Sequence, residues 1–232
     1  MRKMLKNITI VLAGANLLFS CKDPEPAQPD VTIAVKDTIE QPVEVAEEPE
    51  STGIEWKEIK MGELGMVQQI HYADTTNFMH RQIYPCAKCF LRPEAAPALM
   101  TVNTSAMSKH LKLVLFDCYR PKVFQQKMYD MVQNPDYVAE PVKGSMHNRG
   151  LAVDIALADS SGVLLEFGTP FDDFTDKAHY DCNDISAEAK NNRKLLRDIM
   201  VDAGFTPYKN EWWHFNYTAV KYPVDDFVWN CN

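Results

Sequence analysis

The clearest alternation of apolar and other positions along the chain lies between residues 150 and 157. Four large apolar residues there alternate with Ala152, Asp154 and Ala156, and these four are Leu151, Val153, Ile155 and Leu157. This period of two predicts a strand with a carboxylate in the space between two alanines. A buried carboxylate has to be paired, hydrogen-bonded or bound to a metal. The strand therefore predicts a partner for Asp154, unless the acid lies on an edge strand and faces water.

Other segments predict helices. Residues 93–110 have helical composition despite an internal proline, and Pro121 suits the first position of a second helix. A third helix, which should end at Gly204, is indicated by apolar residues at helical spacing, namely Leu195, Leu196, Ile199, Met200 and Ala203. The second helix stacks apolar residues on one side, namely Phe124, Met128 and Met131.

Two further strands complete the expected architecture. Residues 111–116 are an apolar run that ends in an aspartate, and residues 212–217 form an aromatic run near the C-terminus. This mixture predicts an α+β fold in which helices pack on a small, mainly antiparallel sheet. Residues 53–232 have a comfortable length for one such domain.

The first 20 residues have the layout of a secretory signal. A cationic start leads into an apolar run from residue 8 to residue 19, which is too short for a comfortable transmembrane helix. The small residue Ser20 directly before Cys21 resembles the lipobox of bacterial lipoproteins, in which the cysteine is acylated after cleavage. We therefore expect export and a lipid anchor at Cys21, on the periplasmic or cell-surface side of a bacterial membrane. An ordinary signal with an incidental cysteine is the alternative.

Residues 21–52 are expected to form an acidic, proline-rich tether with little to bury. Residues 22–52 hold nine Asp or Glu against two Lys, whereas the chain from residue 53 onward holds 23 acidic and 19 basic residues. The domain is thus only mildly acidic and has no basic stripe. This excludes nucleic acid as an expected partner.

Besides Cys21 the chain has five cysteines, at positions 86, 89, 118, 182 and 231. Export allows disulfides, but an odd number leaves one cysteine over. The pair Cys86 and Cys89 has the spacing of a zinc knuckle or a redox motif, yet no two further zinc ligands stand at suitable spacing. We expect structural cysteines, and the sequence leaves their pairing open.

Histidines supply the partner that Asp154 needs. His147 lies in a glycine-flanked loop just before the strand, and His214 follows Glu211 in the aromatic run. Two imidazoles and one carboxylate form a three-ligand zinc set that leaves the fourth position for water, as in catalytic sites. Glu211, at a turn entering the last strand, is then the candidate general base. Taken alone, His147 could equally well be a helix-capping residue, and His214 could be a hydrogen-bonded histidine in a buried aromatic strand.

Arg120 lies directly after the strand at residues 111–116, where a side chain can point into a cleft. There its fixed charge could stabilise the oxyanion that develops on an attacked carbonyl. A surface or salt-bridged arginine is the alternative.

Taken together, these motifs resemble a known family. Ser145-x-His147-x-x-Gly150-x-x-x-Asp154, Glu211-Trp-Trp-His214 and Asp117-x-Tyr-Arg120-Pro121 are similar to motifs of the VanX-type D-alanyl-D-alanine dipeptidases among the M15 zinc peptidases. The resemblance covers essentially all of the chain after the tether. Further matching motifs are Tyr72-Ala73, Asn77-Phe78, Leu91-Arg92, Gly168-x-x-Phe171-Asp172, Asn192-Arg193 and Leu196-Arg197.

The resemblance implies an M15-like fold with a zinc site in a central cleft and hydrolysis of D-Ala-D-Ala to two D-alanines. One Zn²⁺ per chain would be held by His147, Asp154 and His214, with Glu211 as base and Arg120 as transition-state stabiliser. The pocket would be lined by Ser145, Tyr72 and Asp172. Of these, Asp172 and Tyr72 would hold the free ammonium of a dipeptide, with the adjacent Asp173 as the alternative to Asp172.

Two other functions remain open at this level. One is another M15 activity, a D,D-carboxypeptidase or an L,D-endopeptidase that trims peptidoglycan stems. The other is a zinc-binding or wall-binding lipoprotein without catalysis, against which the presence of both Glu211 and Arg120 argues. The sequence does not distinguish wall recycling from glycopeptide resistance.

Overall fold

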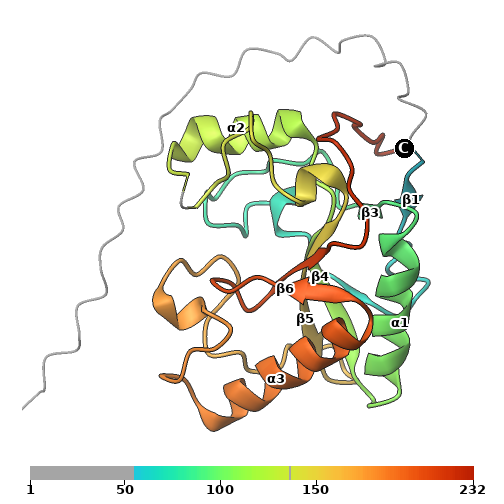
Figure 1. Cartoon of the computed structure of the whole chain (residues 1–232), viewed down its shortest axis with the longest axis vertical. Helices are drawn as coiled ribbons and strands as arrows, with labels where there is room; N and C mark the ends of the chain where they lie inside the picture. The colour runs from blue at the N-terminus through green and yellow to red at the C-terminus, as the bar shows by residue number, and fades with distance from the viewer. Residues whose placement is uncertain (1–54, 136) are drawn as a thin grey trace, which may run out of the picture. The chain divides into compact units, whose positions relative to one another are not determined.

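The computed structural model describes residues 55–135 and 137–232, and Figure 1 shows their arrangement. The predicted signal (1–20), the tether (21–52) and the lipidation site Cys21 lie outside the described residues. The helices are α1 (Ala95–Met107), α2 (Lys122–Val132) and α3 (Ala187–Asp202), with 3-10 turns η1 (His71–Ala73), η2 (His147–Arg149) and η3 (Asp176–Ala178). The strands are β1 (Lys57–Glu58), β2 (Val67–Gln68), β3 (Phe90–Leu91), β4 (Lys112–Asp117), β5 (Ala152–Ala158), β6 (Phe205–Pro207) and β7 (His214–Tyr217).

A five-stranded sheet in the order β2-β4-β5-β7-β6 lies at the centre of the domain. Only β2 and β4 run parallel in it, and the other neighbours are antiparallel, so the predicted mainly antiparallel α+β fold is confirmed. The short strands β1 and β3 form a separate antiparallel pair.

β5 is a central strand, which rules out the edge-strand interpretation of Asp154. It pairs with β4 on one side and with β7 on the other, and all seven of its residues are buried. Both faces of β5 are therefore covered, including the face that carries Asp154. The alanines on either side of the acid provide the space that the site requires.

α3 ends just before Gly204, as its sequence predicts, and α1 lies within the predicted range 93–110. α1 and α3 pack against the sheet and against each other, and Gly204 follows α3 at a φ of 92°. Pro97 lies in the first turn of α1, where backbone N–H groups have no acceptor within the helix. Pro121 caps α2 rather than occupying its first position. None of the described helices is long and apolar enough to cross a membrane.

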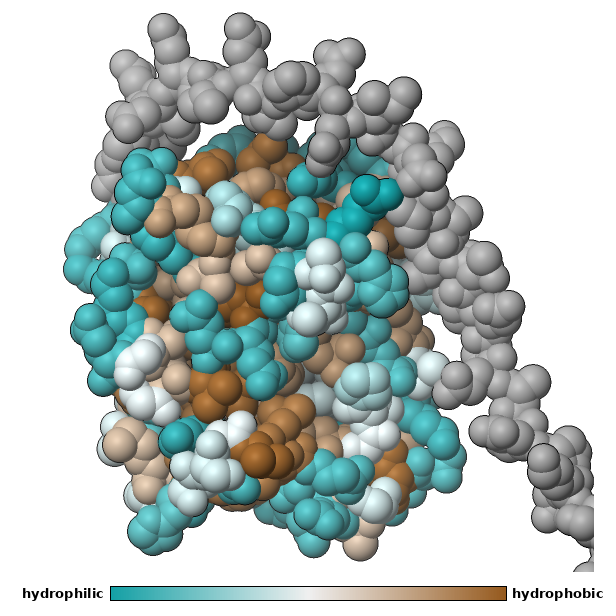
Figure 2. Space-filling view, turned by 180° about the vertical axis from the view of Figure 1, so that it is seen from behind, coloured by the Kyte–Doolittle hydropathy of each residue, from teal (hydrophilic) through white to brown (hydrophobic). Residues whose placement is uncertain are grey.

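Two disulfides connect distant segments, Cys86 with Cys231 and Cys89 with Cys118, and Cys182 is unpaired. One cysteine is therefore left over, as expected, and the redox-pair and zinc-knuckle interpretations of Cys86 and Cys89 are wrong. Cys231 fixes a C-terminal strap, residues 221–232, which contains no helix or strand. In the view of Figure 2, apolar side chains reach the surface in small groups among polar ones.

Candidate metal centre and pocket

Three side chains converge on one point beside the sheet. His147 Nε2 lies 3.1 Å from His214 Nδ1 and 3.3 Å from Asp154 Oδ1, and His214 Nδ1 lies 3.0 Å from Asp154 Oδ1. Ligand atoms about 2.0–2.1 Å from a tetrahedral zinc ion are separated by about 3.3 Å. The donor set therefore fits such an ion. Among the described residues this is the one cluster of His, Cys, Asp and Glu with metal-binding spacing.

The sheet register brings the three residues together. Asp154 in β5 is directly opposite His214 in β7, and such cross-strand neighbours lie close enough to share a ligand. His147 lies in η2, which ends at Gly150 with a φ of 69°. A Cβ at Gly150 would lie 2.3 Å from the ring of Trp56, so only glycine allows this tight return of the chain into β5.

Hydrogen bonds orient both imidazole rings. His147 Nδ1 lies 2.6 Å from the carbonyl oxygen of Cys118, and His214 Nε2 lies 2.9 Å from Oδ1 of Asn216. When each of these nitrogens donates its proton outward, the other ring nitrogen presents its lone pair to the centre. No pattern in the sequence marks the backbone carbonyl of Cys118 or the side chain of Asn216 as a partner of these rings.

The electrostatics of the centre favour positive charge. Burial by itself would raise the pKa of Asp154, but His147 and His214 more than offset it and bring that pKa well below its usual value. Burial would likewise lower the pKa of His214, yet its hydrogen bond to Asp154 and the charge of Asp154 raise it to about 9. The negative charge of Asp154 thus favours positive charge at this point, which a bound cation would supply.

Glu211 lies in the turn between β6 and β7, at the place predicted for it. Its Oε2 is 3.6 Å from His214 Nδ1, and 29% of its side chain is exposed. Burial raises the pKa of Glu211, against the opposing effect of His214. A carboxylate with a raised pKa can both accept a proton and return it at neutral pH.

Arg120 follows the end of β4 by three residues and lines the same pocket as Glu211. Its backbone N–H donates to the carbonyl of His147 at 3.1 Å. The guanidinium donates to Asp117 Oδ2 from Nε and Nη2, at 3.0 and 2.7 Å, and to Gln125 Oε1 from Nη1 at 3.0 Å. Burial opposes the charge of Arg120, but Asp117 raises its pKa well above the usual value. Arg120 is thus salt-bridged, as in the alternative interpretation, and it also lines the pocket.

The residues that orient Arg120 were not identified as such from the sequence. Asp117 is fully buried and also accepts hydrogen bonds from the Tyr84 hydroxyl and from the next backbone N–H. Gln125 is fully buried on α2, and its Nε2 donates to the carbonyl of Ala139 at 2.8 Å. The helical pattern could have indicated that Gln125 is buried, because it lies on the same side of α2 as the buried residues Met128 and Met131. Phe124, the apolar residue next to it, is only half-buried.

One pocket with a volume of about 270 Å³ adjoins the metal centre. It is lined by all eight residues that were predicted for the site: Tyr72, Arg120, Ser145, His147, Asp154, Asp172, Glu211 and His214. The pocket also has apolar walls, to which Met146, Tyr137 and Phe174 contribute.

The end of the pocket formed by Asp172 and Tyr72 is acidic. The Tyr72 hydroxyl donates to both carboxylate oxygens of Asp172, at 3.2 and 3.1 Å. Burial and the charge of Asp154 raise the pKa of Asp172 well above its usual value, so a cation placed beside it would favour the ionised form. Asp173 instead accepts hydrogen bonds from the backbone N–H and the hydroxyl of Thr175. Of the two adjacent aspartates, Asp172 is the one that lines the pocket.

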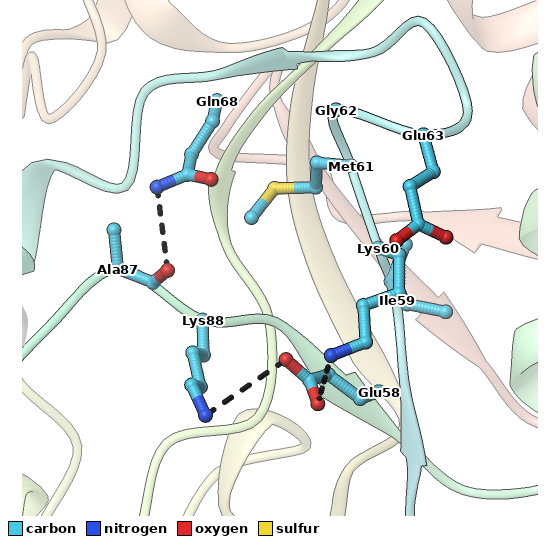
Figure 3. Close-up of a pocket in the computed structure, with 9 residues that line it drawn as sticks. All are labelled: Glu58, Ile59, Lys60, Met61, Gly62, Glu63, Gln68, Ala87 and Lys88. Atoms are coloured by element: carbon cyan, nitrogen blue, oxygen red, sulfur yellow. Dashed lines mark hydrogen bonds and ion pairs between the residues drawn. The ribbon is translucent and has the colours of Figure 1, made fainter. Parts of the chain in front are cut away.

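A second hollow lies at the surface near β1 (Figure 3). There Glu58 forms ion pairs with Lys60 at 2.7 Å and with Lys88 at 4.0 Å. The Gln68 amide donates to the carbonyl of Ala87 at 3.3 Å. None of the three residues of the metal centre lines this hollow.

Several known proteins are similar to this chain. The family model Peptidase M15, described as D-ala-D-ala dipeptidase, matches residues 60–229. The D-alanyl-D-alanine dipeptidase of Escherichia coli K12 is 35% identical over 157 residues, covering 67% of this chain and 81% of that protein. The D-alanyl-D-alanine dipeptidase of Enterococcus faecium is 28% identical over 177 residues, covering 67% and 88%. A solved structure of VanYB in complex with D-Ala-D-Ala is similar over 56% of this chain and 72% of that chain, with 18% identity and a TM-score of 0.37.

Proposed function

The chain belongs to the M15 peptidase family of D-Ala-D-Ala dipeptidases, and on that premise we propose that it is a zinc-dependent enzyme that hydrolyses D-alanyl-D-alanine to two D-alanines. The observation that supports this most strongly is that His147, Asp154 and His214 converge in one pocket. The same pocket is also lined by Glu211, Arg120 and Asp172.

His147, Asp154 and His214 are proposed to hold one zinc ion per chain through Nε2, Oδ1 and Nδ1, the three atoms that converge. Bound zinc would act as a Lewis acid, which lowers the pKa of a water molecule and polarises the scissile carbonyl. Three protein ligands leave a position open for this chemistry, whereas a structural zinc site is closed by four.

Glu211 is the proposed general base. Its carboxylate takes the proton of the attacking water and then delivers this proton to the leaving amine of the second D-alanine. The position of its Oε2, 3.6 Å from His214 Nδ1, supports this role because it adjoins the metal-binding atoms without being one of the three.

Arg120 is proposed to stabilise the negative charge that develops on the carbonyl oxygen in the transition state. Asp117 and Gln125 already hold its guanidinium, so little reorganisation is needed during the reaction. The buried location strengthens its electrostatic effect, because few water molecules screen it.

Asp172 and Tyr72 are proposed to bind the free ammonium of the dipeptide. Asp172 supplies a carboxylate and Tyr72 a hydroxyl, and a charge-assisted hydrogen bond to an ammonium is stronger than one to an uncharged amide. Ser145 adds a hydroxyl to the same pocket, within 3.2 Å of Asn148 Oδ1. Selection for the ammonium favours a dipeptide over the end of a longer stem peptide.

Activity on free D-Ala-D-Ala and on a stem pentapeptide, measured side by side, tests the proposal. We expect the zinc-loaded protein to prefer the dipeptide. A preference for the pentapeptide would favour a D,D-carboxypeptidase or L,D-endopeptidase instead. A metal-loaded protein that is inert towards D,D- and L,D-peptides would favour a binding protein without catalysis.

We further propose that the protein is exported and anchored to a bacterial membrane through lipid on Cys21. The two disulfides of the domain support export, because such bonds persist in oxidising compartments. Detergent partitioning of the wild type against Cys21→Ser tests the anchor, and equal partitioning would contradict it. Destruction of D-Ala-D-Ala outside the cytoplasm would serve peptidoglycan recycling or glycopeptide resistance.

A further inference from the structure

Two aromatic side chains on separate loops meet beside the acidic end of the pocket. The rings of Tyr137 and Phe174 lie 4.4 Å apart between centroids at an angle of 31°. Phe78 packs edge-on against Phe174 from a third segment, with centroids 5.0 Å apart. Tyr137 and Phe174 both line the pocket, and neither has a part in the proposed chemistry.

The contact between Tyr137 and Phe174 involves a residue close in sequence to the one proposed to hold the N-terminus of the substrate. Phe174 follows Asp172 by two residues, and Asp172 with Tyr72 forms the end proposed to hold the ammonium. In a longer peptide with the same scissile bond, an amide would replace this ammonium. The preceding residue would have to leave the pocket at this end, where Phe174 and its partner lie.

Both loops are held in place by buried groups. The carbonyl of Ala139, two residues after Tyr137, accepts from the buried Gln125 at 2.8 Å. On the other loop, Arg193 donates to the carbonyl of Phe167 at 2.7 Å, and Trp212 donates to Thr169 at 2.9 Å. The contact therefore joins two anchored segments.

We propose that the contact between Tyr137 and Phe174 is the steric closure that restricts this enzyme to dipeptides. The inference rests on the proposed function and adds a second selection device to it. Asp172 selects for charge, whereas the two rings exclude volume. These effects are separable, because an amide N–H can still donate to Asp172 once space is available.

The test uses the full zinc-loaded protein and three variants, Tyr137→Ala, Phe174→Ala and the double variant. The two substrates are D-Ala-D-Ala and diacetyl-L-lysyl-D-alanyl-D-alanine, and the readout is the ratio of their kcat/KM values. We expect the preference for the dipeptide to fall about tenfold or more in the double variant, mainly through faster cleavage of the longer peptide. Tyr129→Ala, which removes a half-buried ring of α2 outside the pocket lining, is the control and should leave the ratio unchanged.

Thermal melting identifies which variants are folded, and a folded single variant suffices if the double variant does not fold. An unchanged ratio in every folded variant would overturn the inference while leaving the dipeptidase function intact. A wild-type protein that cleaves the longer peptide as readily as the dipeptide would also overturn it. A wild-type protein that releases no D-alanine from D-Ala-D-Ala would overturn the proposed function itself, and the inference with it.

Discussion

The metal end and the ammonium end of the pocket are built differently. Asp154 and His214 lie on paired strands in the centre of the sheet, and the hydrogen bonds of both histidines fix their rings. Asp172 lies in a loop, at a left-handed φ of 59° that is uncommon among residues other than glycine. The difference indicates that two of the three metal ligands are supported by the rigid sheet, whereas substrate selection depends on loops, which vary more easily.

This contrast predicts two kinds of variant. Substitutions at the metal end should lower kcat or the zinc content, because they affect groups that act in the transition state. Substitutions at the ammonium end should raise KM or change selectivity, because they affect binding of the ground state as well.

The largest effect is expected for Glu211→Gln. The amide cannot accept a proton, so kcat should fall by about 10²- to 10⁴-fold while the zinc content stays at the wild-type level. Steady-state kinetics and metal analysis check this, with the exposed Glu63→Gln as a matched control. Turnover close to that of the wild type would remove Glu211 from the mechanism.

Arg120→Met should follow, with a loss of about 10²- to 10³-fold in kcat and a smaller change in KM. The substitution removes the positive charge next to the carbonyl oxygen but retains a long side chain. It also leaves the buried Asp117 without its ion pair, so thermal melting has to accompany the kinetics. A change in KM alone would assign Arg120 to substrate binding and would contradict the predicted difference between the two ends of the pocket.

At the ammonium end, Asp172→Asn should raise KM for D-Ala-D-Ala by about 10- to 100-fold with less effect on kcat, because a hydrogen bond to a charged group contributes about 1.5–3 kcal/mol. Asp173→Asn is the matched control, since Asp173 is bound by Thr175 outside the contact with Tyr72. Equal effects of the two substitutions would refute the ammonium site.

The smallest effect is expected for Gln125→Met, which retains the volume but removes the hydrogen bonds to Arg120 and Ala139. Because Asp117 still holds the guanidinium, kcat should fall only about tenfold, and the free energy of unfolding should fall by about 1–3 kcal/mol. Gln126→Met, at the exposed neighbouring position, should change neither quantity. A kcat loss as large as that of Arg120→Met would show that Gln125 does more than position the arginine.

The same contrast explains what the sequence could predict. The sequence pattern reveals Asp154 because a carboxylate stands between two alanines in an alternating strand. The pairing of β5 with β7 places this carboxylate opposite His214. Asn216 and the Cys118 carbonyl could not be found, because their roles depend on tertiary contacts and no local pattern marks them. The central position of β5 was not evident either, since alternation suggested one covered face and the structure buries both.

The ammonium end was accessible only through the family resemblance. No periodicity marks Asp172, and its contact with Tyr72 spans 100 residues of sequence. The contact between Tyr137 and Phe174 had no sequence signal, because two irregular loops bring the rings together. The disulfide pairing likewise depends on the fold, which brings Cys231 beside Cys86 across 145 residues.

The most direct test of the central claim is the release of D-alanine from D-Ala-D-Ala by the purified domain, with and without a metal chelator. The zinc-loaded protein should release two D-alanines per dipeptide, lose this activity when the metal is removed, and regain it when zinc is added back. Undiminished release after verified removal of the metal, or no release from the zinc-loaded protein, would contradict the account.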